Sequence, residues 1–365
     1  MPISDPYGAL QVPAHIADRV ASLRGSGMAA NTRRGYSTAW RSFAAWCAAH
    51  GLQSLPATPS TVVHYVIDRS DAVEPDGTWR YTAGTVQIWL SAINKVHDAA
   101  RFERPGNHPD VREVMEGICR EKGRPPRRVL PLTMSPLKAT LASIDLASHP
   151  KGVTGHRDYA LILLGFSGAF RRSELAALEI RDFTIRDDDG CHVLLRRSKT
   201  DQNGRGTTKG IPVGHETFTC SQCAITRWLR VLVAARQEPA DVALILASAT
   251  AAKHVCGELP NLLRLIPPFH PLFPAIRKGG NVTSTASNGG MVASALKRRL
   301  TAAGINAAEY SGHSLRAGFV TEAFRSGATT HEIMRQTGHR NPATVEIYAR
   351  ETDPLQHNAV ARLGL

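Results

Sequence analysis

The apolar residues in the first third of the chain repeat with the period of an α-helix. Between residues 32 and 49 they recur every three or four positions, at Tyr36, Trp40, Phe43 and Cys47. A second stripe of this kind runs through residues 82–100. Residues three and four apart lie on one face of a helix, so both segments are predicted to be amphipathic helices that pack through their stripes. The first third is therefore predicted to be a helical domain.

The polar faces of these two helices are candidate DNA-contacting surfaces. Their side chains are Arg34, Thr38 and Arg41 on the first helix and Gln87, Ser91 and Lys95 on the second. Amphipathic helices in any globular protein expose a polar face to water, so the pattern alone favours solvated surfaces. If the partner is DNA, the same side chains become the natural groove-facing residues.

Residues 123–130 are predicted to link two domains. The surrounding stretch EKGRPPRRVLP combines a glycine, three prolines and four basic residues, and it cannot continue a helix. With 365 residues the chain is long enough for two domains with separate cores. We expect one domain at residues 10–122 and a second at residues 131–365.

Beyond the linker, the pattern predicts helices and one β-hairpin. The helices are expected at 158–178 with a turn near 165–168, at 224–235 and at 291–303. Short strands at 191–197 and 210–213 flank the segment TDQNGRGTT, which predicts a hairpin with a long turn. The helix at 291–303 has a basic surface that includes Lys297. The expected fold is mainly α, with a small sheet in the second domain.

Capping signals divide the C-terminal end into short helices. Thr329 and Glu332 form a capping box for a helix that is expected to end at Gly338. Proline is tolerated in the first turn of a helix, so Pro342 is expected to begin the next one. That helix carries Tyr348.

The net charge points to a polyanionic partner. The chain has 44 Lys and Arg against 31 Asp and Glu, a formal charge of +13, which favours nucleic acid over a membrane surface. No apolar run approaches the length of a membrane span, and the start MPISDPYGAL has no secretory signal pattern. We expect a cytoplasmic protein that is associated with the nucleoid.

The six cysteines are typical of reduced thiols in that compartment. Cys220 and Cys223 form a CxxC motif, with His254 and Cys256 as possible zinc partners further along the chain. The second pair does not have the spacing of a zinc finger. The sequence therefore predicts no metal site.

Several motifs of the second domain resemble those of the tyrosine site-specific recombinases, the phage integrase family. GAFRRSEL is similar to the family's first arginine box, T-G-L-R-x-S/G-E-L, with Ala169 and Phe170 where glycine and an aliphatic residue are usual. HSLR matches the H-x-x-R box, and TGHRNPATVEIYAR is similar to L-G-H-x-x-x-x-T-x-x-Y. RRSKTDQ supplies a lysine where the family has its catalytic lysine. The resemblance assigns the catalytic site to Arg171, Glu174, Lys199, His313, Arg316, His339 and Tyr348.

Phosphodiester chemistry explains four of these residues, the two arginines, the tyrosine and the first histidine. An attacked phosphate develops charge on its nonbridging oxygens, and the guanidinium groups of Arg171 and Arg316 suit those oxygens. A tyrosine hydroxyl has a pKa of about 10, so Tyr348 needs nearby cations and a proton acceptor to become a nucleophile. His313 is the candidate acceptor.

The remaining residues assist the leaving group and the arginines. The 5′-oxygen needs a proton when it leaves, and Lys199 on the hairpin is the expected general acid, with Lys209 as the alternative. His339 is expected to donate a hydrogen bond to the phosphate. Glu174, three residues beyond Arg171, is expected to orient it.

A phosphotyrosine bond conserves the energy of the broken phosphodiester, so the reaction needs neither ATP nor a metal cofactor. The resemblance implies a site-specific DNA recombinase that acts through a covalent 3′-phosphotyrosine at inverted-repeat sites. It also implies a C-shaped clamp made of a core-binding and a catalytic domain, a homodimer on one site, and a homotetramer in the synapse. The alternative is a DNA-binding regulator or accessory factor on the same scaffold that does not recombine DNA.

Overall fold

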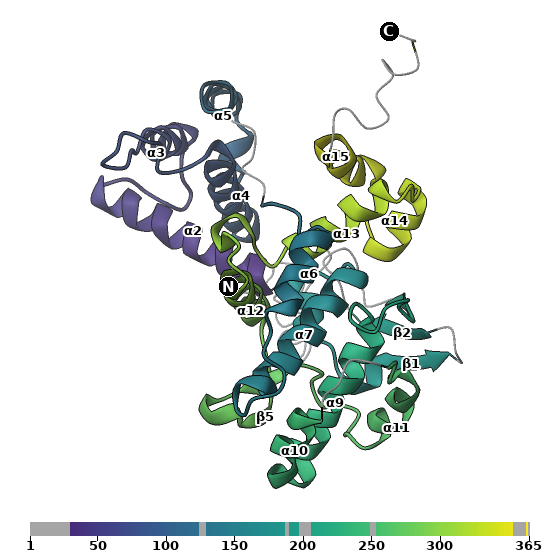
Figure 1. The fold of residues 1–365 in the computed structure, drawn as a ribbon. Helices are drawn as coiled ribbons and strands as arrows, with labels where there is room; N and C mark the ends of the chain where they lie inside the picture. Colours follow the sequence, from purple (N-terminus) through teal and green to yellow (C-terminus); the bar gives the residue numbers. More distant parts are fainter. Residues whose placement is uncertain are drawn as a thin grey trace, which may run out of the picture. The chain divides into compact units, whose positions relative to one another are not determined.

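The computed structural model describes residues 30–123, 129–186, 190–196, 206–248, 253–352 and residue 363. The chain divides into two compact units, residues 1–127 and 128–365, referred to below as the N-terminal and C-terminal units. Both are dominated by helices, which confirms the prediction of a mainly α fold (Figure 1). Among the described residues, no helix is both long and apolar enough to cross a membrane.

The N-terminal unit contains four described α-helices, two of which were predicted from the apolar stripes. They are α2 (Ala30–Ala49), α3 (Pro59–Ser70), α4 (Ala83–Ala99) and α5 (Pro109–Glu121), with a short 3-10 turn, η1 (Pro105–Asn107), before α5. Thr58 and Thr82 cap α3 and α4, because each side chain accepts a hydrogen bond from the backbone N–H three residues later.

The apolar stripes of α2 and α4 form the core of the N-terminal unit. Phe43 and Tyr65 are fully buried and their rings meet edge to face, with centroids 5.0 Å apart. His97 is buried as well, accepting a hydrogen bond from Ala57 N on one ring nitrogen and contacting Ile93 O with the other. The candidate DNA-contacting side chains of α2 and α4 are all exposed: Arg34, Thr38, Arg41, Gln87, Ser91 and Lys95.

The C-terminal unit is built around two buried helices, α7 (Lys151–Ser167) and α9 (Ser221–Gln237), which pack against each other. The other helices are α6 (Met134–Ala142), α8 (Arg172–Ala176), α10 (Val242–Ala247), α11 (Leu259–Arg264), α12 (Gly289–Ala302), α13 (Ser314–Arg325), α14 (Thr330–Thr337) and α15 (Pro342–Thr352). Figure 1 shows α13, α14 and α15 grouped at one end of this unit, whereas α10 and α11 lie beside α9 at the other.

The small sheet has one strand more than predicted. Strands β1 (Phe183–Arg186), β2 (Gly190–Leu195) and β3 (Thr207–Pro212) pair antiparallel in that order, with Val193 opposite Lys209. A separate two-stranded sheet joins β4 (Pro274–Ile276) and β5 (Val282–Ala286). The predicted turn between β2 and β3 lies largely outside the described residues.

The predicted turn at residues 165–168 is present but begins later than expected. Helix α7 continues through Gly165 to Ser167, and the chain turns at Gly168 and Ala169. A side chain at Gly165 would meet Leu315 and Leu175 at 2.8 and 2.9 Å. This glycine therefore serves the close packing of α13 and α8 onto α7, and the sequence pattern does not distinguish that role from a turn.

The predicted capping signals at the C-terminal end are confirmed. Thr329 and Glu332 form the reciprocal hydrogen bonds of a capping box at the start of α14. Gly338 follows the helix with a left-handed φ of 70°, a conformation that favours glycine. Pro342 begins α15, and the fully buried Val345 packs this helix against Val320 and Ile333.

Candidate active site

Arg171 and Glu174 form an ion pair at the start of α8. The Glu174 carboxylate accepts hydrogen bonds from Arg171 Nη1 at 2.6 Å and from Arg171 N at 2.9 Å. The side chain of Glu174 is 4% exposed, while that of Arg171 is 20% exposed. Glu174 thus holds the guanidinium in one direction and leaves part of it accessible to a bound anion.

Arg316 on α13 is almost completely buried, at 1% exposure. Its Nη1 donates to Ala169 O at 2.8 Å, and its Nη2 lies 3.0 Å from His339 Nε2. Ala169 is buried and has a left-handed φ of 47°, at a position where the family usually has glycine. A non-glycine residue held in this conformation costs about 1 kcal/mol or more. The strained peptide aims its carbonyl at Arg316 and so fixes the guanidinium beside the arginine box.

The tautomer of His339 follows from its two hydrogen bonds. A guanidinium can only donate, so Nε2 accepts from Arg316. The Thr337 hydroxyl gives its proton to Ile333 O, so it accepts from His339 Nδ1, 2.9 Å away. The imidazole is therefore neutral with its proton on Nδ1. Burial lowers the pKa of His339 to about 3, and the charges of Arg316 and Arg171 add to that effect.

His313 stands at the N-cap position of α13, next to the two arginines. The ring reaches the surface, yet desolvation by the surrounding protein lowers the pKa of His313, and the charges of Arg316 and Arg171 lower it further. The imidazole is thus neutral at physiological pH and retains a nitrogen lone pair that can accept a proton.

Lys209 is buried behind the arginine box. In the sequence it was only the alternative candidate for the general acid. Its Nζ is inside the unit at 1% residue exposure, donates to Gly168 O at 2.6 Å and to Gln336 O, and lies 4.8 Å from the Phe170 ring centre. Burial lowers the pKa of Lys209 to about 7, and the charge of Arg316 contributes. Lys209 ties β3 to the residues that immediately precede Arg171 and His339.

Gln336 completes this cross-link and was missed by the sequence analysis. Its side-chain amide donates to Ser167 O at 2.8 Å and to Gly210 O at 3.0 Å. Together, Gln336 and Lys209 join the end of α7, strand β3 and the end of α14. A polar residue just before the T-G-H motif was the only available signal, and polar residues on short helices are too common to be informative.

Two of the predicted catalytic residues are described incompletely. Tyr348 belongs to α15, three residues beyond the buried anchor Val345, but its side chain lies outside the described residues. Lys199 falls wholly outside them. The described part of the site therefore brings together Arg171, Glu174, Arg316 and His339, with His313 beside the arginines and Lys209 behind them.

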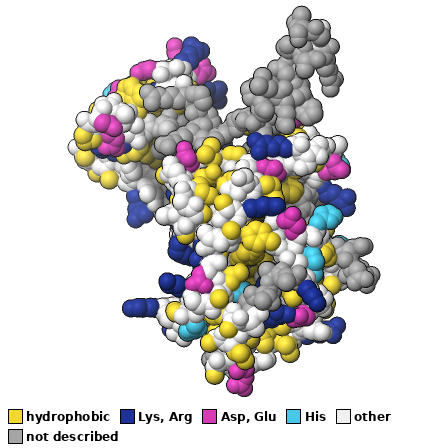
Figure 2. Space-filling view, viewed as in Figure 1, with side chains coloured by type: hydrophobic (Ala, Val, Ile, Leu, Met, Phe, Trp, Pro, Cys, Tyr) yellow, Lys and Arg dark blue, Asp and Glu magenta, His cyan; other side chains and the backbone are white. Residues whose placement is uncertain are grey.

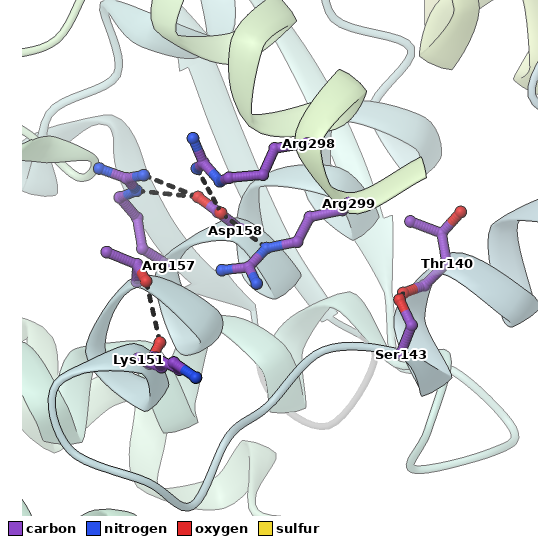
Figure 3. Close-up of polar contacts among 8 residues, drawn as sticks. Thr140, Ser143, Lys151, Arg157, Asp158, Arg298 and Arg299 are labelled. Carbon is purple, nitrogen blue, oxygen red and sulfur yellow. Dashed lines mark hydrogen bonds and ion pairs between the residues drawn. The ribbon is translucent and has the colours of Figure 1, made fainter. Parts of the chain in front are cut away.

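The basic face of α12 is organised by one buried carboxylate (Figure 3). Asp158 on α7 has no solvent exposure and accepts from Arg157 at 2.8 Å, from Arg298 at 2.9 Å and from Arg299 at 2.9 Å. Burial by itself would raise the pKa of Asp158, but the three guanidinium charges outweigh it and lower the pKa. Lys297, the remaining candidate DNA-contacting residue, is exposed on the same helix.

Replacing Asp158 with asparagine is expected to destabilise the C-terminal unit by about 3 kcal/mol, because three guanidinium groups lose the charge that compensates their partial burial. Arg298→Ala is the matched control, since that side chain is 52% exposed and its ion pair is expected to contribute under about 1 kcal/mol. Urea unfolding curves measure both effects. Equal, small changes for the two variants would show that Asp158 does not organise this face.

Positive side chains are scattered on the face of the molecule that Figure 2 draws. On the face drawn in Figure 2, dark-blue Lys and Arg side chains alternate with neutral and acidic ones on both units. The net charge of +13 suits a polyanionic partner.

Comparison with known sequences identifies the family. A profile of the phage integrase family matches residues 143–354. An integrase/recombinase XerD homolog from Selenomonas ruminantium is 32% identical over 336 residues, which cover 91% of this chain and 85% of that protein. Recombinase Cre of Escherichia phage P1 is 23% identical over 339 residues, covering 88% and 84%.

Solved structures share the fold. The Tn1549 transposon integrase in complex with transposon right end DNA has a TM-score of 0.54 at 14% identity, covering 96% of this chain and 98% of that chain. A lambda integrase tetramer bound to a Holliday junction gives a TM-score of 0.53 at 12% identity, covering 91% and 75%.

A mainly helical fold that gathers cationic and imidazole groups around the start of α8 and α13 defines an enzyme that cleaves and rejoins DNA strands. The chain belongs to the phage integrase family, the tyrosine site-specific recombinases.

Proposed function

We propose that this recombinase cleaves each strand through Tyr348 and conserves the broken bond as a 3′-phosphotyrosine. The observation that carries the proposal is the direct contact between Arg316 and His339, two residues from separate motifs, beside the Arg171–Glu174 pair. Tyr348 follows in the next helix, α15, which the buried Val345 packs against α13 and α14.

The two arginines bind the scissile phosphate and stabilise the charge that grows on its nonbridging oxygens. Arg171 is held by Glu174 and Arg316 by Ala169 O, so neither guanidinium has to reorganise during the reaction. The planar guanidinium of Arg316 carries five N–H donors, so it can hold more than one acceptor in fixed directions. Preorganised donors of this kind account for much of the rate enhancement in phosphoryl transfer.

His339 changes its hydrogen bonding when the phosphate binds. In the DNA-free geometry its Nε2 accepts from Arg316, and only a protonated Nε2 can donate to a phosphate oxygen. A bound anion offsets the arginine charges that hold the pKa of His339 low. Phosphate binding therefore favours a proton on Nε2, which makes His339 the hydrogen-bond donor that the sequence analysis expected.

The cleavage step moves two protons. The Tyr348 oxygen forms a bond to phosphorus and gives its proton to the neutral His313 imidazole. The bond from phosphorus to the 5′-oxygen breaks, and Lys199 gives the departing oxygen a proton. Religation is the reverse, with a new 5′-hydroxyl attacking the phosphotyrosine. No step consumes ATP.

Lys199 is the general acid in this proposal and Lys209 is a positioning residue. The ammonium of Lys209 is buried and directed at two backbone carbonyls, so its contacts hold the segments that carry Arg171 and His339. A proton donor needs to reach the leaving oxygen on the DNA, which an inward-facing group with two carbonyl partners does poorly.

Replacing Lys199 with alanine is expected to slow cleavage by about 10²–10⁴-fold, the usual contribution of a general acid. A substrate with sulfur in place of the 5′-oxygen has a leaving group that needs no proton, so it should restore the rate of Lys199→Ala. Lys209→Ala should not be rescued, because it disturbs the arginines and His339. Rescue of Lys209→Ala alone in single-turnover cleavage assays would move the general-acid role to Lys209.

The proposal assigns DNA binding to both units. Residues 10–122 form the core-binding domain, residues 123–130 the linker and residues 131–365 the catalytic domain. The exposed polar faces of α2 and α4, together with Lys297, contact the duplex. Two protomers bind an inverted-repeat site and four form the synapse, in keeping with the lambda integrase tetramer on a Holliday junction. DNA binding of this kind would associate the protein with the nucleoid.

The proposal is tested by selecting bound fragments from random duplex DNA and incubating the recovered site with purified protein alone. The expected result is a covalent protein–DNA adduct on nicked substrates and recombinant products from two sites. Specific binding without any adduct would contradict the proposal and identify a DNA-binding regulator or accessory factor instead.

A further inference from the structure

A second cluster of reactive side chains lies in the C-terminal unit, away from the catalytic motifs. Within the described residues, the ligand atoms of Cys220, Cys223, His254 and Cys256 all lie within 4.8 Å of one another. Cys256 Sγ is 3.5 Å from Cys220 Sγ and 3.2 Å from Cys223 Sγ. His254 Nδ1 is 3.3 Å from Cys223 Sγ and 3.8 Å from Cys256 Sγ.

These separations fit a tetrahedral metal site better than a disulfide. With metal–sulfur bonds of about 2.3 Å, tetrahedral ligand atoms stand about 3.8 Å apart. A disulfide joins its sulfurs at about 2.0 Å and would involve only two of the three thiols. The observed separations lie much closer to the edges of the tetrahedron, and all four groups converge on one point.

Surrounding hydrogen bonds prepare three of the four groups as ligands. Gly214 N donates to Cys220 Sγ at 3.3 Å, and Val255 N donates to Cys223 Sγ at 3.4 Å. Backbone N–H groups directed at sulfur stabilise thiolates, the form that binds metals. His254 Nε2 lies 3.3 Å from His215 O, so this nitrogen carries the proton and Nδ1 keeps its lone pair for a metal.

We propose that these four residues bind one Zn²⁺ ion in a closed structural site. Three thiolates and one imidazole form a soft ligand set that suits zinc, whereas magnesium and calcium require oxygen ligands. Four protein ligands leave no open position for water or substrate, so the ion has no catalytic task. The sequence predicted no metal site because His254 and Cys256 do not follow the CxxC motif at the spacing of a zinc finger. Helices α9 and α10 lie between the two pairs of ligands, and the fold brings the pairs together.

The metal ties two segments of the unit together, and a hydrogen bond from Gly214 to a ligand sulfur adds a third. Cys220 caps α9 and Cys223 lies in its first turn, Gly214 follows strand β3, and His254 and Cys256 precede α11. The segment before α11 is also joined to α9 by the Arg230–Glu258 ion pair. Strand β3 also carries Lys209, which binds Gly168 O near the arginine box. The zinc site therefore supports the strand from which this cross-link starts.

The test is the metal content of the full-length protein expressed with zinc in the medium. We expect one zinc per chain after desalting, and release of that zinc as a mercurial titrates three thiols. Chelation at elevated temperature should lower the melting temperature, and adding Zn²⁺ back should restore it. Replacing the ion with Co²⁺ should give the visible absorption bands of a tetrahedral thiolate site.

Matched variants separate the cluster from the other cysteines. Cys223→Ser should lose the zinc, whereas Cys191→Ala, a buried thiol, and Cys119→Ser, an exposed one, should keep it. Wild-type protein that contains no zinc, or that forms a Cys223–Cys256 disulfide under reducing conditions, would overturn the proposal. Full zinc content in folded Cys223→Ser would overturn it as well. Since the wild-type stoichiometry decides the matter, the test does not depend on the folding of the variant.

Discussion

Replacing Tyr348 with phenylalanine will abolish the covalent protein–DNA adduct and leave DNA binding nearly unchanged. The substitution removes only the hydroxyl and keeps the aromatic ring. If Tyr348 is the nucleophile, cleavage should fall by about 10⁴-fold or more, as it does when an enzyme loses its nucleophile. A nicked suicide substrate, which traps the adduct, measures the effect directly.

The matched control for this experiment is Tyr310→Phe. Tyr310 lies in the same unit, just before the H-x-x-R motif, and is 8% exposed. Its variant should form the adduct at close to the wild-type rate. An adduct formed by Tyr348→Phe would show that a different residue attacks the phosphate, and mapping the labelled peptide would identify it.

Much of the fold could be predicted because it depends on local signals. The stripe through Phe43 and Cys47 predicted α2, and both residues are fully buried. The capping box of Thr329 and the left-handed Gly338 set the ends of α14, as their residue types require. Signals of this kind act within one helical turn, so they can be recognised in the sequence without knowledge of the tertiary structure.

The catalytic motifs were also visible in the sequence, because the family places Arg171, Arg316 and His339 in three short patterns. What holds these residues could not be predicted. Lys209 reaches a carbonyl 41 residues away and another 127 residues away. The packing of α7, β3 and α14 determines these partners, and no local sequence pattern encodes that packing.

The zinc cluster and the Asp158 site show the same limit. In the sequence, Asp158 is one polar residue within an apolar helix. In the structure it binds two arginines of α12 that lie 140 and 141 residues further along the sequence. Cys220 and His254 come from segments separated by two helices. Buried polar groups require partners, so a lone Asp or CxxC in an apolar context is a sign that partners exist, but it does not identify them.

Ala169 links the predictable and unpredictable parts of the site. The sequence showed it as a departure from the family's glycine, and the structure shows that the position requires a left-handed backbone. The resulting peptide orientation supplies the carbonyl that holds Arg316. A left-handed backbone at this position accounts for a preference for glycine there.

Arg316→Lys is expected to reduce the single-turnover cleavage rate by about 10³-fold although it preserves the charge. Before the phosphate binds, the guanidinium makes directed bonds to Ala169 O and His339 Nε2. An ammonium is a point charge without the planar fork, so it cannot reproduce these directions or bind the phosphate with the same geometry. His339 loses the contact that positions its ring, and both phosphate-binding groups are impaired together.

The same assay on Arg335→Lys provides the control, because Arg335 is exposed on α14 and makes none of these contacts. Its rate should stay within about twofold of wild type, as expected for a surface substitution. Circular dichroism and DNA-binding measurements on Arg316→Lys distinguish a catalytic loss from unfolding. A folded, DNA-binding Arg316→Lys variant that cleaves at the wild-type rate would show that charge alone suffices at this position, and that the fixed geometry around Ala169 does not contribute to catalysis.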